Sequence, residues 1–99
     1  MAARWRRLQV SMLLKVNSVK CLGGHRLRVA FTDGTAGEHD FAAMTAEPGQ
    51  LMEPLRDPSY FARVFLDFGA PTWPNGFDIA PRWLQMEMES AGELRRDAA

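Results

Sequence analysis

A seven-residue stretch that begins at Arg26, RLRVAFT, alternates polar or small side chains with large apolar ones. In an extended chain, Leu27, Val29 and Phe31 would lie on one face, and Arg26 and Arg28 on the other. This period of two is typical of a strand with one buried and one solvent-exposed face. It predicts an antiparallel sheet that packs on one side and faces water on the other.

Glycine-rich turn signals flank this strand. Gly23-Gly24 precedes it, and Asp33-Gly34 follows it. Asp-Gly favours a type I′ hairpin turn, in which both central residues have positive φ. Alternating stretches over 13–21 and 35–41 then become the neighbouring strands, so the chain is expected to open as a three-stranded antiparallel meander.

The second half of the chain predicts a mixture of helices and strands. Asp57-Pro58 is a helix-start signal, because aspartate can cap free backbone N–H groups and proline fits the first turn. Asn75-Gly76 predicts another hairpin turn. We expect short helical stretches over 50–55 and 58–63, strands over 64–68 and 77–79, and a final helix over 81–90 opened by Asp78 and Pro81. The fold class is therefore α+β: an antiparallel sheet of about five strands with a short inserted helix and a C-terminal helix.

The length of 99 residues fits one domain. We expect a flexible basic arm over 1–12, a single α+β domain over 13–91 and a frayed polar tail over 92–99. The sequence has no apolar run long enough for a membrane span, and a signal peptide would need a longer apolar region near its start. The single cysteine, Cys21, rules out an internal disulfide framework. These features predict a cytoplasmic protein.

Charge is divided unevenly along the chain. The first 32 residues hold seven bases and no acid, whereas the remainder holds all twelve acids and five bases. Arg26 and Arg28 are expected on the exposed strand face with Lys15 on the neighbouring strand, and these three are the candidate partner-binding residues. Alternatively, they only keep an open sheet face hydrated, paired with Glu38 and Asp40 of the return strand.

The sequence predicts no catalytic, metal or cofactor-binding residues. His25, His39 and Asp40 could suggest a metal site, but a site needs three or four converging ligands. The aspartates at 33, 57, 67 and 78 each stand at an expected turn or helix cap, which explains them without acid–base chemistry. We therefore expect a protein that is not an enzyme and has no cofactor.

A longer set of residues carries a resemblance to a known family. The set comprises Phe31-Thr32-Asp33-Gly34, Glu53-Pro54-Leu55-Arg56-Asp57-Pro58, Tyr60-Phe61, Val64, Asp67, Gly69, Trp73-Pro74-Asn75-Gly76, Asp78 and Ala80-Pro81. Over about residues 13–88 the chain resembles bacterial domain-of-unknown-function family 2442. The resemblance implies a compact α+β domain with no established enzymatic activity. Some relatives carry a helix-turn-helix segment after the domain, and many are encoded beside small toxin-like proteins, which implies an antitoxin role.

The most distinctive motif residues have two interpretations. A structural one, in which prolines, turn residues and caps fix the backbone and aromatic side chains fill the core, covers Asp57, Pro58, Phe61, Trp73, Pro74, Asn75, Gly76, Asp78 and Pro81. The alternative is a recognition loop that displays Trp73 and Phe77 to a partner. We expect the structural role, because each residue has a local task.

The function predicted from these observations is a non-enzymatic protein-interaction module, in its most specific form the antitoxin-like member of a toxin–antitoxin pair. Its partner would then be a small toxin-like neighbour. One alternative is a nucleic-acid-associated regulatory protein that uses the basic N-terminal half; another is a small metabolite-binding domain or enzyme. Weak, non-specific nucleic-acid binding is expected, a membrane partner is not, and a homodimer is left open.

Overall fold

The computed structural model describes residues 14–96, so the basic arm over 1–12 and the last three residues lie outside the described part. In chain order the elements are β1 (Val16–Gly23), β2 (Arg26–Phe31), β3 (Thr35–Asp40), α2 (Ala42–Thr45), the 3₁₀ helix η1 (Pro54–Arg56), α3 (Pro58–Phe61), β4 (Phe65–Asp67), β5 (Ala70–Thr72), α4 (Pro81–Ser90) and β6 (Arg95–Arg96). The chain is an α+β domain, as the sequence predicts.

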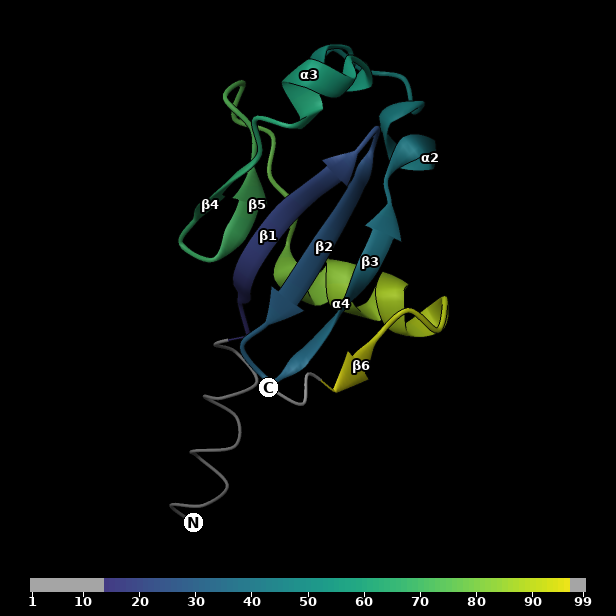
Figure 1. Cartoon of the computed structure of the whole chain (residues 1–99). Helices are drawn as coiled ribbons and strands as arrows, with labels where there is room; N and C mark the ends of the chain where they lie inside the picture. The colour runs from purple at the N-terminus through teal and green to yellow at the C-terminus, as the bar shows by residue number, and fades with distance from the viewer. Residues whose placement is uncertain (1–13, 97–99) are drawn as a thin grey trace.

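The strands form two sheets rather than one. The larger has the order β1-β2-β3-β6 with antiparallel pairing throughout, and the smaller is the β4–β5 hairpin. Helix α4 crosses behind the larger sheet, whereas the face turned toward the viewer in Figure 1 carries none of the described helices. We call this uncovered side the outer face. It is the open face that the alternation of β2 predicts.

The hydrophobic core lies between the larger sheet and α4. Leu27, Val29 and Phe31, which the alternation places on one face, are buried there. Phe61 and Trp73, expected to fill the core, are buried too, as is Leu84 of α4. Aromatic rings run through this core in contact, from Phe41 to Phe61 and on to Trp73. Because Phe61 belongs to α3 and Phe41 directly follows β3, this contact joins α3 to the end of the sheet.

The turn at Asp33-Gly34 does not have the predicted I′ geometry, and the turn at Asn75-Gly76 is similar to the turn at Asp33-Gly34. Gly34 and Gly76 have positive φ, but the residues before them, Asp33 and Asn75, do not. Each loop therefore has three residues with glycine at the left-handed position, an alternative that hairpins commonly use. The I′ pattern of two positive φ values occurs instead at Phe68 and Gly69, in the turn between β4 and β5.

Helix α4 has the predicted bounds, Pro81–Ser90, but not the predicted cap. Its N-cap is Ala80 without a side-chain hydrogen bond, so Asp78 does not cap it. Asp78 lies two residues before the N-cap, where it forms an isolated β-bridge with Thr72. The helix ends in a Schellman motif, in which Gly92 N donates to Glu89 O and Glu93 N donates to Met88 O.

The residues after α4 differ from the expected frayed tail. Beyond Gly92 the chain forms β6, which pairs Thr35 with Arg96 and Ala36 with Arg95. The guanidinium of Arg96 also donates to the carbonyl oxygen of Asp33 at 3.0 Å. A Cβ on Gly37 would collide with the carbonyl oxygen of Glu93, so glycine allows this close approach to β3.

Candidate functional site

The outer face of the sheet carries the candidate residues Arg26 and Arg28. Antiparallel register sets Lys20 of β1 opposite Arg28 on one side and Glu38 of β3 on the other. Asp40 is opposite Arg26 in the same way. With Arg95, which is opposite Ala36, this face holds four bases and two acids.

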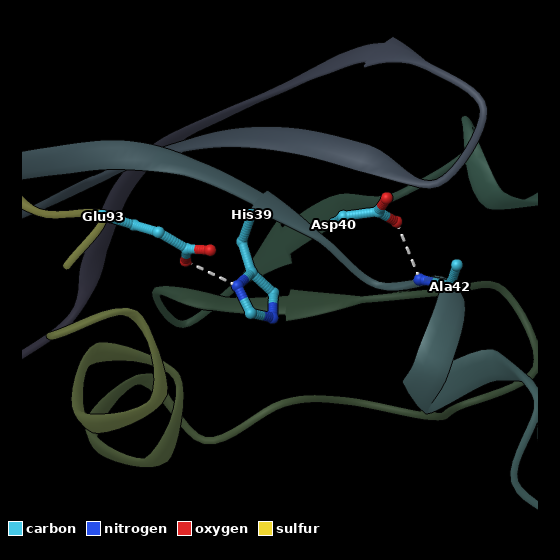
Figure 2. A network of polar contacts seen from close by, with 4 residues as sticks. All are labelled: His39, Asp40, Ala42 and Glu93. Atoms are coloured by element: carbon cyan, nitrogen blue, oxygen red, sulfur yellow. Dashed lines mark hydrogen bonds and ion pairs between the residues drawn. The ribbon is translucent and has the colours of Figure 1, made fainter. Parts of the chain in front are cut away.

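Carboxylates neutralise this face only in part. Glu38 Oε1 lies 2.7 Å from a guanidinium nitrogen of Arg26, and both side chains are about half exposed. Asp40 instead turns to the backbone and accepts a 2.9 Å hydrogen bond from Ala42 N, as Figure 2 shows. Within residues 14–96, Arg28 has no carboxylate within ion-pair distance. The arginine at the middle of the face is therefore free to contact an acidic partner.

Lys15 lies elsewhere than the sequence reasoning expects. Its backbone pairs with Thr32 through two hydrogen bonds of 2.9 and 3.0 Å. Its aliphatic stem packs beside Gly69. The base next to Arg28 is Lys20, which was missed. Counting outward from the turn at Gly24 and His25 would pair Arg28 with Cys21, and the register shift between Cys21 and Gly23 moves the pairing to Lys20.

A depression of about 630 Å³ opens where β6 leaves β3. Arg28, Arg95 and Arg96 line it together with Glu38 and Glu93. Planar guanidinium groups form bidentate hydrogen bonds with carboxylates. The depression therefore suits one or two acidic side chains of a partner. Arg95 and Arg96 were assigned to the polar tail, and no local signal in the sequence brings them to this edge.

Asp33 is the most strongly bonded carboxylate near this edge. Its Oδ1 accepts hydrogen bonds from the backbone and hydroxyl of Thr35, and its Oδ2 accepts one from Gln85 at 2.8 Å. Burial raises the pKa of Asp33, but the hydrogen bonds from Thr35 and Gln85 and the charge of Arg96 outweigh it and lower the pKa. These contacts join the β2–β3 turn to α4, which is a structural role.

The residues weighed for a metal site do not converge. Nδ1 of His39 lies 2.7 Å from Oε1 of Glu93, while the side chain of Asp40 points away from that contact (Figure 2). Nε2 of His25 contacts the carbonyl oxygen of Leu55 at 2.9 Å. In the part of the chain that the structure covers, no group of three His, Cys, Asp or Glu residues could hold a metal ion.

The Trp73-Pro74-Asn75-Gly76 segment is anchored in the core by its tryptophan, whereas Pro74 and Gly76 are exposed. Trp73 is 0% exposed, and its indole nitrogen donates a 2.9 Å hydrogen bond to the carbonyl oxygen of Phe61. The amide of Asn75 donates to Leu51 O and accepts from Phe77 N. Trp73 is thus not displayed to solvent. Asp57 caps α3, with Pro58 in its first turn, by accepting from Ser59 N.

The family described as "Protein of unknown function (DUF2442)" matches residues 16–87. This range runs from the start of β1 into α4 and covers most of the chain. The chain belongs to the DUF2442 family. No curated protein and no solved structure matches it at a significant level.

For this DUF2442 chain, the family match covers the aromatic core and the part of the outer face on β1, β2 and β3, but it ends before Arg95 and Arg96. The β6 side of the depression is therefore outside the matched range. None of the helices within residues 14–96 is long and apolar enough to cross a membrane.

Proposed function

We propose that this DUF2442 domain is a non-enzymatic protein-binding module whose contact surface is the outer face of the larger sheet. The observation that carries the proposal is the state of Arg28: it lies at the middle of a face free of the described helices, beside Lys20, with no carboxylate partner in the described chain. Arginine is enriched at interfaces, where its planar fork binds carboxylates.

The chemistry of the face defines the partner. Four bases outnumber two acids there, and one acid, Glu38, already contacts Arg26. A partner with surface carboxylates would reach Arg28 and Lys20 directly, and a further carboxylate would fit between Arg28 and Arg95. Such complementarity speeds association and selects among partners.

In its most specific form, the proposal names a small toxin-like protein encoded beside this one as the partner. This step rests on the resemblance to the family, many members of which have such neighbours. The domain would act as the antitoxin by covering the toxin. Co-expression should then relieve growth inhibition caused by the neighbouring gene product.

Calorimetry with the purified neighbour protein tests the surface. Reversing the charge with Arg28→Glu and Lys20→Glu should weaken binding by at least roughly tenfold. Arg63→Glu is the matched control, since Arg63 is exposed two residues after α3, where it stacks over Tyr60. The control should bind as wild type does. If the two proteins do not associate at micromolar concentration, the antitoxin form of the proposal is wrong.

The same surface suggests a competing partner, nucleic acid. Binding to phosphates weakens steeply with salt, with a slope of roughly −0.9 in log affinity per phosphate contacted. A titration of duplex DNA at several salt concentrations should give only weak, salt-sensitive binding. Sequence-specific binding in the nanomolar range at physiological salt would overturn the protein-binding proposal, because that affinity is typical of specific DNA binders.

A further inference from the structure

The turn of the β4–β5 hairpin displays an aromatic ring in an unfavourable backbone conformation. Phe68 has φ +51° and is 89% exposed, so this large apolar side chain is almost entirely in solvent. Type I′ turns favour Asn, Asp or Gly at this position, because a Cβ crowds the left-handed backbone. Within the described chain, Phe68 has no packing contact that explains why it occupies the position.

The hairpin holds this ring in a fixed place. Val16 N at the start of β1 donates a 2.8 Å hydrogen bond to Gly69 O, the residue after Phe68. A Cβ built on Gly69 would come within 2.6 Å of the Cβ of Lys15, so the turn lies tightly against β1. The hairpin stands at the side of the larger sheet in Figure 1. The backbone that carries Phe68 is thus held in place, which lowers the backbone entropy lost when the side chain is bound.

The molecule also has an open apolar groove that could receive such a ring. Its volume is about 280 Å³, and it is lined by Met44, Phe77, Asp78, Ile79, Ala80 and Trp83. Trp83 is 46% exposed at the start of α4. The lining side chains are mostly apolar, and a groove of this size has room for a phenyl ring.

We propose that Phe68 of one copy of this chain inserts into the Trp83 groove of a second copy. The charges beside the ring and the groove, as well as their shapes, favour a second copy of the chain as the binding partner. Lys15 packs against the Phe68 turn and Asp67 precedes it. Asp78 lines the groove, and Arg82 precedes Trp83 in α4. Each surface therefore carries one base and one acid beside its apolar centre, and the two surfaces can pair acid with base.

The charged residues beside the two surfaces are available for this pairing. All four are exposed, and none is in an ion pair within the described residues. Neither the Phe68 turn nor the lining of the groove includes Arg28 or Lys20, so this contact uses other residues than the proposed partner-binding face.

Sedimentation velocity over a concentration series measures the proposed contact. The wild-type chain should self-associate as its concentration rises, and Phe68→Asn should raise the dissociation constant by roughly thirtyfold or more, as expected for an interface hot spot. Trp83→Ala should have a similar effect. Met86→Ala is the matched control, because Met86 is a large exposed side chain of the same helix that does not line the groove, and it should leave association unchanged.

A mixing experiment separates this contact from a general loss of stability. Phe68→Asn keeps the groove, and Trp83→Ala keeps the displayed ring, so a mixture of the two variants retains one complete contact. The mixture should form a heterodimer more readily than either variant alone associates. No gain on mixing would contradict the pairing of ring with groove.

Three other outcomes would overturn the proposal. If the wild-type chain stays monomeric up to about millimolar concentration, the proposed contact does not form. A dissociation constant above that concentration is too weak for a functional interface. Association that Phe68→Asn leaves intact must use another surface. Sedimentation of the wild type, but not of Phe68→Asn, with vesicles of phosphatidylcholine and phosphatidylglycerol would assign the displayed ring to a lipid surface instead.

Discussion

The indole nitrogen of Trp73 donates its hydrogen bond to Phe61 O, so the loop before α4 is fastened to the end of α3 inside the core. Trp73→Phe should lower the free energy of unfolding by roughly 2 to 4 kcal/mol, because it loses volume and leaves a buried acceptor without this donor. Urea denaturation followed by circular dichroism measures the loss. Trp83→Phe is the control and should change stability by less than about 0.5 kcal/mol, since Trp83 is half exposed. Equal losses in both variants would contradict the role given to Trp73.

Two aspartates before helices should differ in their contribution to stability. Asp57 accepts a hydrogen bond from Ser59 N at 3.0 Å, whereas α4 has no side-chain cap and Asp78 precedes it unused. Asp57→Ala should cost about 1 kcal/mol of unfolding free energy, and Asp78→Ala less than about 0.5 kcal/mol. Thermal or urea unfolding of the two variants gives the comparison. Similar losses would mean that Asp78 has a structural role other than capping.

The β4–β5 turn predicts opposite effects at neighbouring positions. Phe68→Asn should stabilise the monomer by roughly 1 kcal/mol, because asparagine tolerates the left-handed conformation better than phenylalanine. Gly69→Ala should destabilise it by more than about 1 kcal/mol, since φ is +79° there and a Cβ would meet Lys15. Both variants should be unfolded at low micromolar concentration, where self-association contributes little. A destabilised Phe68→Asn would show that the ring supports the fold.

The lowered pKa of Asp33 makes stability depend on pH in the acid range. The folded state holds this carboxyl ionised at lower pH than the unfolded chain does, so its contribution is complete above the unfolded pKa, roughly 3.9. This stabilisation is lost as the pH falls through the pKa that Asp33 has in the folded state. The difference in stability between the wild type and Asp33→Asn should therefore shrink as the pH is lowered from about 5 toward 2. A constant difference over that range would show that ionisation of Asp33 does not contribute.

Sequence reasoning was most successful where a local pattern decides the structure. The alternation around Val29 predicts β2, the proline at 81 predicts the start of α4, and Asp57-Pro58 predicts α3. Each of these features depends on residues close together in the chain. Local turn chemistry was less reliable, because Asp33-Gly34 and Asn75-Gly76 also fit three-residue loops.

The features that the sequence did not predict depend on contacts between distant segments. The pairing of β6 with β3 follows from the turn after Gly92 and the space that Gly37 leaves, and neither is visible in the residues of β6. The position of Lys20 opposite Arg28 requires the register of the first hairpin, including its bulges. The short helix α2, with no side-chain cap and only four residues, carries no strong helix signal. The sequence therefore predicts Arg26 and Arg28 of the candidate site, but not the neighbouring bases Lys20, Arg95 and Arg96.

Because β6 comes late in the sequence, its pairing with β3 is expected to form after the β1–β2–β3 meander. The β1–β2 and β2–β3 pairings close short loops, whereas the bridge between Thr35 and Arg96 joins residues 61 positions apart (96 − 35). Closing such a long loop costs more entropy and is slow compared with closing a hairpin. During synthesis the meander is complete well before residue 96 leaves the ribosome, and until then the outer edge of β3 is open to other strands. The newly made chain is consequently most exposed to aggregation along β3, in the interval before its last strand arrives.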